Sequence, residues 1–323
     1  MKAKLFLMAM AVGTLTGTCQ TEISKKSRTS DRVRTDETIV KFKTIRVNGL
    51  DIFYREAGDK SRPSILFLHG FPSSSHMYRD ILDDLSSKYH VIAPDYPGFG
   101  LSSAPGIKEY AYTFDNLSIT MDHFIDALQL KDLTLYMQDY GGPIGFRIAA
   151  RRPELIRGLI IQNANAYKEG LGEAVAPLVN YFEDPNQETE KGAREILTTT
   201  KWQYTDGVED ISKVSPDSYM VDQFYLDRPG NDEIQLALFQ NYRTNVALYD
   251  EWQSYFKLKQ PPTLVIWGKN DKIFITPGAE AYKRDLKNIE VHLLNGGHFL
   301  LEEHHMEAAR LIDAFLSRAL TRK

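Results

Sequence analysis

The chain has 323 residues, of which 42% are hydrophobic and 25% are charged, as is usual for a soluble globular protein. Its net charge of −4 and its pI near 6.1 give no electrostatic reason to expect a polyanion partner, so nucleic acid binding is disfavoured. The length suits one hydrophobic core enlarged by an insertion. The single cysteine excludes an intramolecular disulfide.

The first residues have the pattern of a targeting segment. Lys2 and Lys4 supply positive charge, and Leu5 to Val12 form an apolar run that is too short to span a bilayer. We therefore predict that residues 1–19 are a signal segment and that the protein is exported to the periplasm or cell envelope of a bacterium. The polar, charged stretch that follows predicts a flexible tether over residues 20–38.

Cys19 stands where the apolar segment ends, and this position resembles the lipid-modified cysteine of bacterial lipoproteins. The preceding residues Thr16, Gly17 and Thr18 depart from the Leu-Ala-Gly pattern of that signal. Two outcomes therefore stay open. Either a lipid on Cys19 anchors the protein to a membrane, or the chain is cleaved next to Cys19 without lipid.

Apolar runs separated by turn signals predict the sheet. Val40 to Val47 and Leu50 to Glu56 flank Asn48-Gly49, which tolerates the positive φ angles of a tight hairpin turn. Unbroken apolar runs follow at Ser64 to Leu68, His90 to Ala93, Leu133 to Met137, Leu159 to Ile161, Leu264 to Trp267 and Val291 to Leu294. Such runs are typical of strands covered on both faces, and helix-like patterns such as Leu117 to Leu128 separate them. We predict an α/β fold with a mostly parallel central sheet between helices.

The strand pattern stops between residues 164 and 256, where aromatic side chains become frequent. They are Tyr167, Tyr181, Phe182, Trp202, Tyr204, Tyr219, Phe224, Tyr225, Phe239, Tyr242, Tyr249 and Trp252. We interpret this stretch as a helical cap inserted into a core formed by residues 39–163 and 257–323. Most of these rings are expected to pack inside the cap, which leaves few to face a ligand.

Asp139 lies where a strand meets a helix. The strand-like run 133–137 leads into Gln138-Asp139-Tyr140-Gly141-Gly142, and a helix-like pattern starts at Pro143. An Asp before two glycines is in isolation most often a simple turn. Between a strand and a helix it has the position of a nucleophile elbow, where glycines let the helix approach the strand. Asp139 is therefore the candidate nucleophile.

The segment His69-Gly70-Phe71-Pro72 directly follows the run 64–68 and resembles the oxyanion loop of α/β hydrolases. In that fold a backbone N–H just after the strand faces the nucleophile, so the resemblance assigns one oxyanion donor to Phe71 and a second to the N–H of Tyr140. Asp95 to Ser102 resembles the turn after the next strand. Each motif alone is a Gly/Pro turn, but their order and spacing together indicate this fold.

Two further motifs complete a catalytic set. Asp271 ends Trp267-Gly268-Lys269-Asn270-Asp271, and His298 follows Gly296-Gly297, each after a predicted strand. The chain order of nucleophile, acid and histidine is the one that α/β hydrolases use. Glu302, Glu303, His304 and His305 could suggest a metal site, but they stand at a predicted helix start, where a solvated acidic turn is the simpler interpretation. We predict no metal and no cofactor.

From about Val40 onward the chain resembles the α/β-hydrolase branch that contains epoxide hydrolases and haloalkane dehalogenases, in which Asp replaces the serine of esterases and lipases. The resemblance implies that Asp139 attacks an sp³ carbon of a small apolar electrophile and forms an alkyl ester. His298, oriented by Asp271, would then activate the water that hydrolyses this ester, with the N–H groups of Phe71 and Tyr140 holding the oxyanion.

The leaving group separates the two members of that branch. Haloalkane dehalogenases have Trp directly after the nucleophile, or Asn in the oxyanion loop, whereas this chain has Tyr140 and Phe71. Epoxide hydrolases use cap tyrosines as acids, and Asn241-Tyr242-Arg243-Thr244-Asn245 resembles their second tyrosine segment. Gln138 instead resembles some dehalogenases. We therefore expect an epoxide hydrolase and keep the dehalogenase as the alternative.

The partner of Tyr242 is less defined. The first family tyrosine aligns with Leu178, so Tyr181 or Tyr204 is the candidate replacement, unless a single acid serves. Another ester-forming or ester-cleaving hydrolase also fits this scaffold. From a different class, a binding protein without turnover would fit if a catalytic member were missing, but all members are present.

Overall fold

The computed structural model describes residues 35–319, which build one eight-stranded sheet. Its strands are β1 (Lys41–Val47), β2 (Leu50–Ala57), β3 (Ser64–Leu68), β4 (His90–Pro94), β5 (Leu133–Gln138), β6 (Ile156–Gln162), β7 (Thr263–Gly268) and β8 (Ile289–Leu294). The predicted signal segment 1–19, with Cys19, lies outside the described residues. Within residues 35–319, no helix is long and apolar enough to cross a membrane.

The strand order is β1-β2-β4-β3-β5-β6-β7-β8, in which β1, β2 and β4 pair antiparallel and all later neighbours pair parallel. The chain runs from β3 out to β4 and returns to β5 on the other side of β3. Such a reversal opens a crevice at the carboxyl ends of the strands, where ligands bind in this kind of sheet. The fold thereby brings the segments after β3 and β5 together.

Successive side chains along each strand point to opposite faces of the sheet, and both faces are apolar. On β3, Ile65 and Phe67 belong to the core cluster under α1 and α12, whereas Leu66 and Leu68 belong to the cluster under α2 and α3. All five residues of β3 are buried, as are those of β4, β5 and β7. Two buried faces per strand explain the unbroken apolar runs in the sequence.

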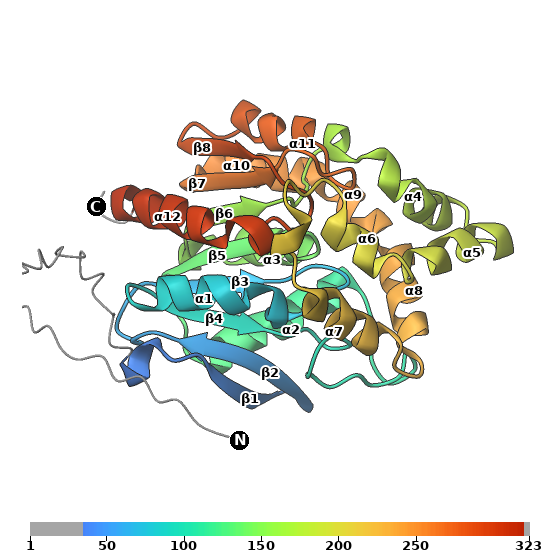
Figure 1. The fold of residues 1–323 in the computed structure, drawn as a ribbon, viewed down its shortest axis with the longest axis horizontal. Helices are drawn as coiled ribbons and strands as arrows, with labels where there is room; N and C mark the ends of the chain where they lie inside the picture. The colour runs from blue at the N-terminus through green and yellow to red at the C-terminus, as the bar shows by residue number, and fades with distance from the viewer. Residues whose placement is uncertain (1–34, 320–323) are drawn as a thin grey trace, which may run out of the picture. The chain divides into compact units, whose positions relative to one another are not determined.

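Helices cover both faces of the sheet. Figure 1 shows α1 and α12 next to each other on one face, while α2 packs on α3 and α3 on α10. The core helices are α1 (Arg79–Ser86), α2 (Phe114–Ala127), α3 (Gly141–Arg151), α11 (Thr276–Ala281) and α12 (Leu301–Ala319). Short 3₁₀ turns are η1 (Asp36–Thr38), η2 (Ser75–Tyr78), η3 (Pro153–Leu155), η4 (Lys168–Gly170), η5 (Glu173–Val175), η6 (Ile211–Lys213) and η7 (Tyr282–Arg284).

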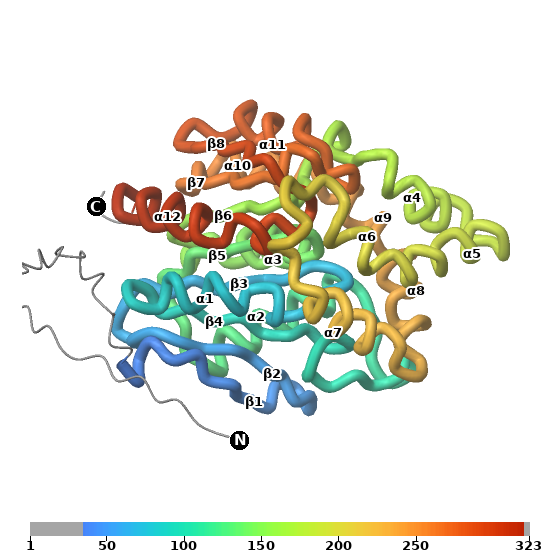
Figure 2. The backbone as a smooth tube through the Cα atoms, in the orientation of Figure 1, coloured from blue at the N-terminus to red at the C-terminus, as the bar shows by residue number. Residues whose placement is uncertain are grey.

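The connection from β6 to β7 is helical throughout. It contains α4 (Ala176–Glu183), α5 (Gln187–Ile196), α6 (Thr200–Thr205), α7 (Pro216–Leu226), α8 (Asn231–Asn241), α9 (Arg243–Ala247) and α10 (Tyr249–Lys259). Figure 2 traces this excursion away from the sheet and back to it. The insertion and the sheet belong to one compact unit.

Two predicted boundaries differ from the structure. Helix α2 begins at Phe114 rather than Leu117, because the Thr113 side chain accepts a hydrogen bond from the Asn116 N–H at 3.1 Å and caps the helix earlier. Residues 36–38, which we assigned to the flexible tether, form η1, and the carbonyl of Glu37 accepts the N–H of Gly58. Regular structure within the described residues therefore begins before the first strand.

Because both faces of the sheet are buried, we expect two phenylalanines to differ in how much they contribute to stability. Phe67 is fully buried, with its ring centroid 4.8 Å from Tyr136 and 5.0 Å from Tyr78, whereas Phe42 is 64% exposed. Phe67→Ala should lower the free energy of unfolding by about 3–5 kcal/mol, because it leaves a cavity, and Phe42→Ala by less than about 1 kcal/mol. Urea unfolding followed by circular dichroism measures both. Equal losses would contradict the assignment of Phe67 to the central core.

Candidate active site

Asp139 occupies a strained turn between β5 and α3. Its φ angle is +49°, a left-handed conformation that is uncommon for a residue with a side chain. Gly141 permits this turn, because a Cβ at this position would lie 1.9 Å from the carbonyl oxygen of Leu68. The turn places the Asp139 side chain, only 6% exposed, at the carboxyl edge of the sheet.

Backbone N–H groups hold the Asp139 carboxylate from two sides. The N–H of Phe71 donates to Asp139 Oδ1 at 2.8 Å, and the N–H of Tyr140 also hydrogen-bonds this carboxylate. Gly70 allows the approach, since a Cβ there would lie 2.3 Å from Asp139 Cβ. The two donors nominated from the sequence thus converge on Asp139.

His298 joins Asp139 to Asp271. Its Nδ1 hydrogen-bonds Asp271 Oδ2 at 2.8 Å, and its Nε2 lies 3.8 Å from Asp139 Oδ2. All three side chains are buried. Asp271 Oδ1 accepts the N–H of Ile273 at 2.7 Å, so the acid is fixed at both oxygens. The arrangement is that of a nucleophile, a base and an acid that orients the base.

The charges of this triad depend on one another. Burial raises the pKa of the Asp139 carboxyl, and His298 and the N–H groups of Phe71 and Tyr140 oppose that shift. Burial by itself lowers the pKa of His298, but the Asp271 and Asp139 carboxylates outweigh it and raise that pKa above its ordinary value. The imidazolium form of His298 is therefore favoured while Asp139 carries its charge.

Two amide side chains contact the triad, and neither contact was predicted from the sequence. Asn163 donates from its side-chain Nδ2 to Asp271 Oδ2 at 2.7 Å, and its backbone carbonyl accepts the N–H of Asp139 at 3.2 Å. Gln138 places its Nε2 2.9 Å from His298 Nε2, the nitrogen that faces Asp139. Asn163 directly follows β6. The rule that ligand-facing side chains follow parallel strands could have found it.

A cavity of about 370 Å³ opens above Asp139. Apolar side chains of the helical insertion and of the sheet edge surround it, including Leu178, Ile196, Phe239 and Phe274. The volume lies at the small end of the range for ligand pockets, and a mostly apolar wall suits a small apolar molecule.

Tyr140 and Tyr242 line the same cavity as Asp139. Burial raises the pKa of both phenols well above the ordinary value, so both stay protonated at neutral pH. The Tyr140 hydroxyl is buried and has no hydrogen-bond partner among residues 35–319. The Tyr242 hydroxyl shares a hydrogen bond with Tyr249.

The other two candidate tyrosines lie elsewhere. Tyr204 donates to Asp222 Oδ2 at 2.5 Å and stacks on Phe299, and it does not line the cavity. Its hydroxyl is already engaged by a buried carboxylate, so the structure does not support an acid role. Tyr181 packs in the core of the insertion and does not line the cavity either, whereas Leu178 does.

The acidic segment at the start of α12 is engaged in pairing. Glu302 forms a bidentate ion pair with Arg79, at 2.9 and 3.0 Å, and accepts from Ser218 at 3.1 Å. Glu303 accepts the backbone N–H groups of Glu209 and Asp210. These contacts tie α12 to the helical insertion. Among residues 35–319, no group of three or more His, Cys, Asp or Glu side chains is arranged to hold a metal.

Known proteins resemble the chain over most of its length. A family model described as the alpha/beta hydrolase fold matches residues 63–305. The chain belongs to the α/β-hydrolase-fold family. An uncharacterized hydrolase of Saccharomyces cerevisiae is 39% identical to this α/β hydrolase over 293 residues, which are 85% of this chain and 96% of the yeast protein.

Haloalkane dehalogenases are also similar to this α/β hydrolase. One from Bradyrhizobium diazoefficiens is 44% identical over 113 residues, which are 35% of this chain and 36% of that protein. The crystal structure of a haloalkane dehalogenase from Agrobacterium tumefaciens C58 superposes with a TM-score of 0.73 at 26% identity, covering 87% of this chain and 97% of that one. These similarities confirm the fold and the branch that the sequence motifs predicted.

The coupled charges of the triad predict how His298 responds to neutralisation of Asp139. Asp139→Asn should lower the pKa of His298, because it removes an anion that stabilises the imidazolium, and Asp271→Asn should lower it further. NMR titration of the His298 ring, assigned with His298→Gln, measures both shifts. An unchanged pKa in Asp139→Asn would show that the 3.8 Å contact carries no significant interaction.

Proposed function

We propose that this α/β hydrolase opens small apolar epoxides through an alkyl ester on Asp139. The observation that carries the proposal is that two protonated phenols, Tyr140 and Tyr242, line the cavity beside the Asp139 carboxylate. An epoxide oxygen must gain a proton as its C–O bond breaks, and a phenol is suited to supply it. The family and the hydrolase fold are consistent with this chemistry.

In the first step, Asp139 Oδ2 attacks an epoxide carbon. The other oxygen, Oδ1, is held by the Phe71 N–H at 2.8 Å, which leaves Oδ2 on the side that faces His298. A C–O ester bond forms, the epoxide C–O bond breaks, and Tyr242 delivers its proton to the oxygen. No base is needed for this step, because a carboxylate is already a nucleophile.

In the second step, water attacks the ester carbonyl. Alkylation removes the negative charge of Asp139, so the pKa of His298 falls, its proton passes to the Tyr242 phenolate, and the neutral ring becomes a competent base. Nε2 takes the proton of the water, and the N–H groups of Phe71 and Tyr140 stabilise the oxyanion. The acyl C–O bond of the ester then breaks, His298 gives the proton to the departing oxygen so that a diol is released, and the Asp139 carboxyl returns a proton to His298. The nucleophile thus also controls when the base is active.

Haloalkane dehalogenation is the second candidate. Relatives named haloalkane dehalogenases favour it, and so does Trp202, the only one of the three tryptophans that lines the cavity. Trp202 is 39% exposed, whereas Trp267 donates its indole N–H to Phe274 O. A halide needs N–H donors but no proton, so the two candidates make different demands on Tyr242.

The two-step scheme predicts that His298→Gln accumulates the ester. Hydrolysis should slow by about 10²–10⁴-fold without the base, while attack by Asp139 continues. Intact-protein mass spectrometry after mixing with an epoxide should show one alkyl adduct, mapped to Asp139 by peptide analysis, and Asp139→Ala should show none. If His298→Gln shows no adduct and no burst, the order of steps is wrong.

The proton requirement predicts a substrate-dependent effect of Tyr242→Phe. Single-turnover alkylation by an epoxide should slow by roughly 10–1,000-fold on loss of the acid, whereas an alkyl bromide of similar size should react at nearly the native rate. Equal losses on both substrates would indicate damaged packing. Native epoxide reactivity would point instead to the dehalogenase.

A further inference from the structure

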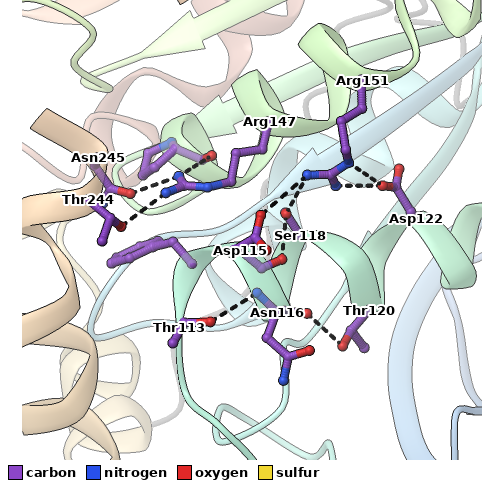
Figure 3. Close-up of polar contacts among 12 residues, drawn as sticks. Thr113, Asp115, Asn116, Ser118, Thr120, Asp122, Arg147, Arg151, Thr244 and Asn245 are labelled. Carbon is purple, nitrogen blue, oxygen red and sulfur yellow. Dashed lines mark hydrogen bonds and ion pairs between the residues drawn. The ribbon is translucent and has the colours of Figure 1, made fainter. Parts of the chain in front are cut away.

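Arg147 is a buried cation that the triad does not use. It lies on α3, two turns after the nucleophile elbow, and is only 4% exposed. No carboxylate in residues 35–319 forms an ion pair with it, although burying an unpaired charge is costly. Its guanidinium instead donates to three neutral oxygens, as Figure 3 shows, and its Nε has no hydrogen-bond partner in this part of the chain. Such a charge needs a physical reason.

The contacts of Arg147 point to the segment that carries Tyr242. Nη1 donates to Asn245 Oδ1 at 2.8 Å, and Nη2 donates to Thr244 Oγ1 at 3.1 Å. The backbone N–H of Asn245 donates in turn to the carbonyl of Tyr242 at 2.8 Å. Thr244 and Asn245 follow Tyr242 in the chain and form what we call the Tyr242 arm. Arg147 therefore attaches this arm to α3, the helix that follows Asp139.

Aromatic contacts extend this connection to the phenol ring. The Phe114 ring lies under the guanidinium, 5.9 Å from Cζ, and meets the Tyr242 ring edge-on at 5.6 Å. Trp252 covers the guanidinium from α10 at 5.5 Å. These aromatic side chains form a medium of low polarity between the cation and the Tyr242 ring, in which the field of Arg147 is screened less than in water.

We propose that Arg147 is a positioning residue for Tyr242, holding its arm in place and stabilising the phenolate that forms when Tyr242 protonates the substrate oxygen. The inference rests on the proposed epoxide opening. In that step the negative charge moves from Asp139, which becomes a neutral ester, to Tyr242. A fixed cation on the Tyr242 side favours this transfer, and it is already in place before the reaction.

The surrounding charges leave Arg147 uncompensated. Burial lowers the pKa of Arg147 to about 10, so it stays charged at neutral pH. The groups facing Arg147 are Asp115, Arg151, Glu251 and Tyr242, and those facing Tyr242 are Tyr249, Asp139 and Tyr140. Asp115 and Glu251 are exposed, so solvent screens them. A phenolate formed on Tyr242 during turnover is then a buried anion that faces Arg147.

Arg151 supplies the matched control. It lies one turn further along α3, is 35% exposed on its side chain, and pairs with Asp122, with Nε 3.0 Å from Oδ2. Figure 3 shows that its contacts run to Asp122, Ser118 and Asp115 on α2, away from Thr244 and Asn245. Removing Arg151 deletes an arginine from the same helix without touching the arm of Tyr242.

The test titrates the phenol directly. With 3,5-difluorotyrosine incorporated at position 242 to bring the phenol into an accessible pH range, ¹⁹F NMR gives the titration midpoint in the native background and in variants. Arg147→Gln keeps a polar side chain but removes the charge, and should raise the midpoint by about one unit, a tenfold weaker acid. Arg147→Lys keeps the charge, and Arg151→Met is the control. Both should stay within about 0.3 units of native.

A second variant covers the case in which Arg147→Gln does not fold. Asn245→Asp places a carboxylate next to the guanidinium and removes an Nδ2 that has no hydrogen-bond partner within residues 35–319. This carboxylate neutralises Arg147, so the midpoint should also rise. A midpoint unchanged in every folded variant of Arg147 and Asn245, or an equal shift in Arg151→Met, overturns the proposal.

Kinetics separate this proposal from the proposed function. Arg147→Gln should slow epoxide alkylation about 10-fold, matching the shift of the midpoint, and slow alkyl bromide alkylation less than about threefold. If the native protein reacts with no epoxide, the proposed function fails, but the ¹⁹F titration still decides whether Arg147 stabilises the phenolate. If epoxides react and the midpoint does not move, only the role of Arg147 fails.

Discussion

The site depends on keeping a carboxylate ionised where almost no water reaches it. Desolvation favours the protonated acid, so something must hold the anion in place. Here backbone N–H groups do so, because they are dipoles fixed by the fold and cannot turn away as a side chain can. Their positions follow from the crossover that puts the ends of β3 and β5 side by side, and from glycines that let these two segments approach. The strand order thus determines which backbone N–H groups stabilise the Asp139 carboxylate.

In the mechanism that we propose, the same constraint ties the two half-reactions together. Two carboxylates stabilise the protonated form of the histidine between them, so that this ring is not free to accept a proton from water. Converting one carboxylate into an ester changes that environment without any movement of the chain. Formation of the ester therefore determines when His298 can act as a base. This explains how one closely packed site can serve a first step that needs a charged Asp139 and a second step that needs a neutral His298.

The sequence predicted those parts of the molecule whose signal is local. Unbroken apolar runs mark strands buried on both faces, and Asp139 and Asp271 follow such runs. The run before His298 is the edge strand β8, which is partly exposed and not covered on both faces as we predicted. The three residues still meet at one edge, because all three strands are parallel. Side-chain hydrogen bonds across the fold carry no such signal. Tyr204 and Tyr242 look alike in sequence as cap tyrosines, but one donates to a buried Asp222 and the other lines the cavity. Gln138 and Asn163 were missed for the same reason, because amide side chains serve many structural roles.

Asn163 also joins the carboxyl ends of the two strands that flank the helical insertion. It is the first residue after β6, and its Oδ1 accepts the N–H of Gly268, the last residue of β7, at 2.9 Å. Its Nδ2 donates to Asp271 at the same edge of the sheet. This link lies outside the insertion, so a change in the length of the insertion can leave it in place, because closing a longer loop costs little additional entropy.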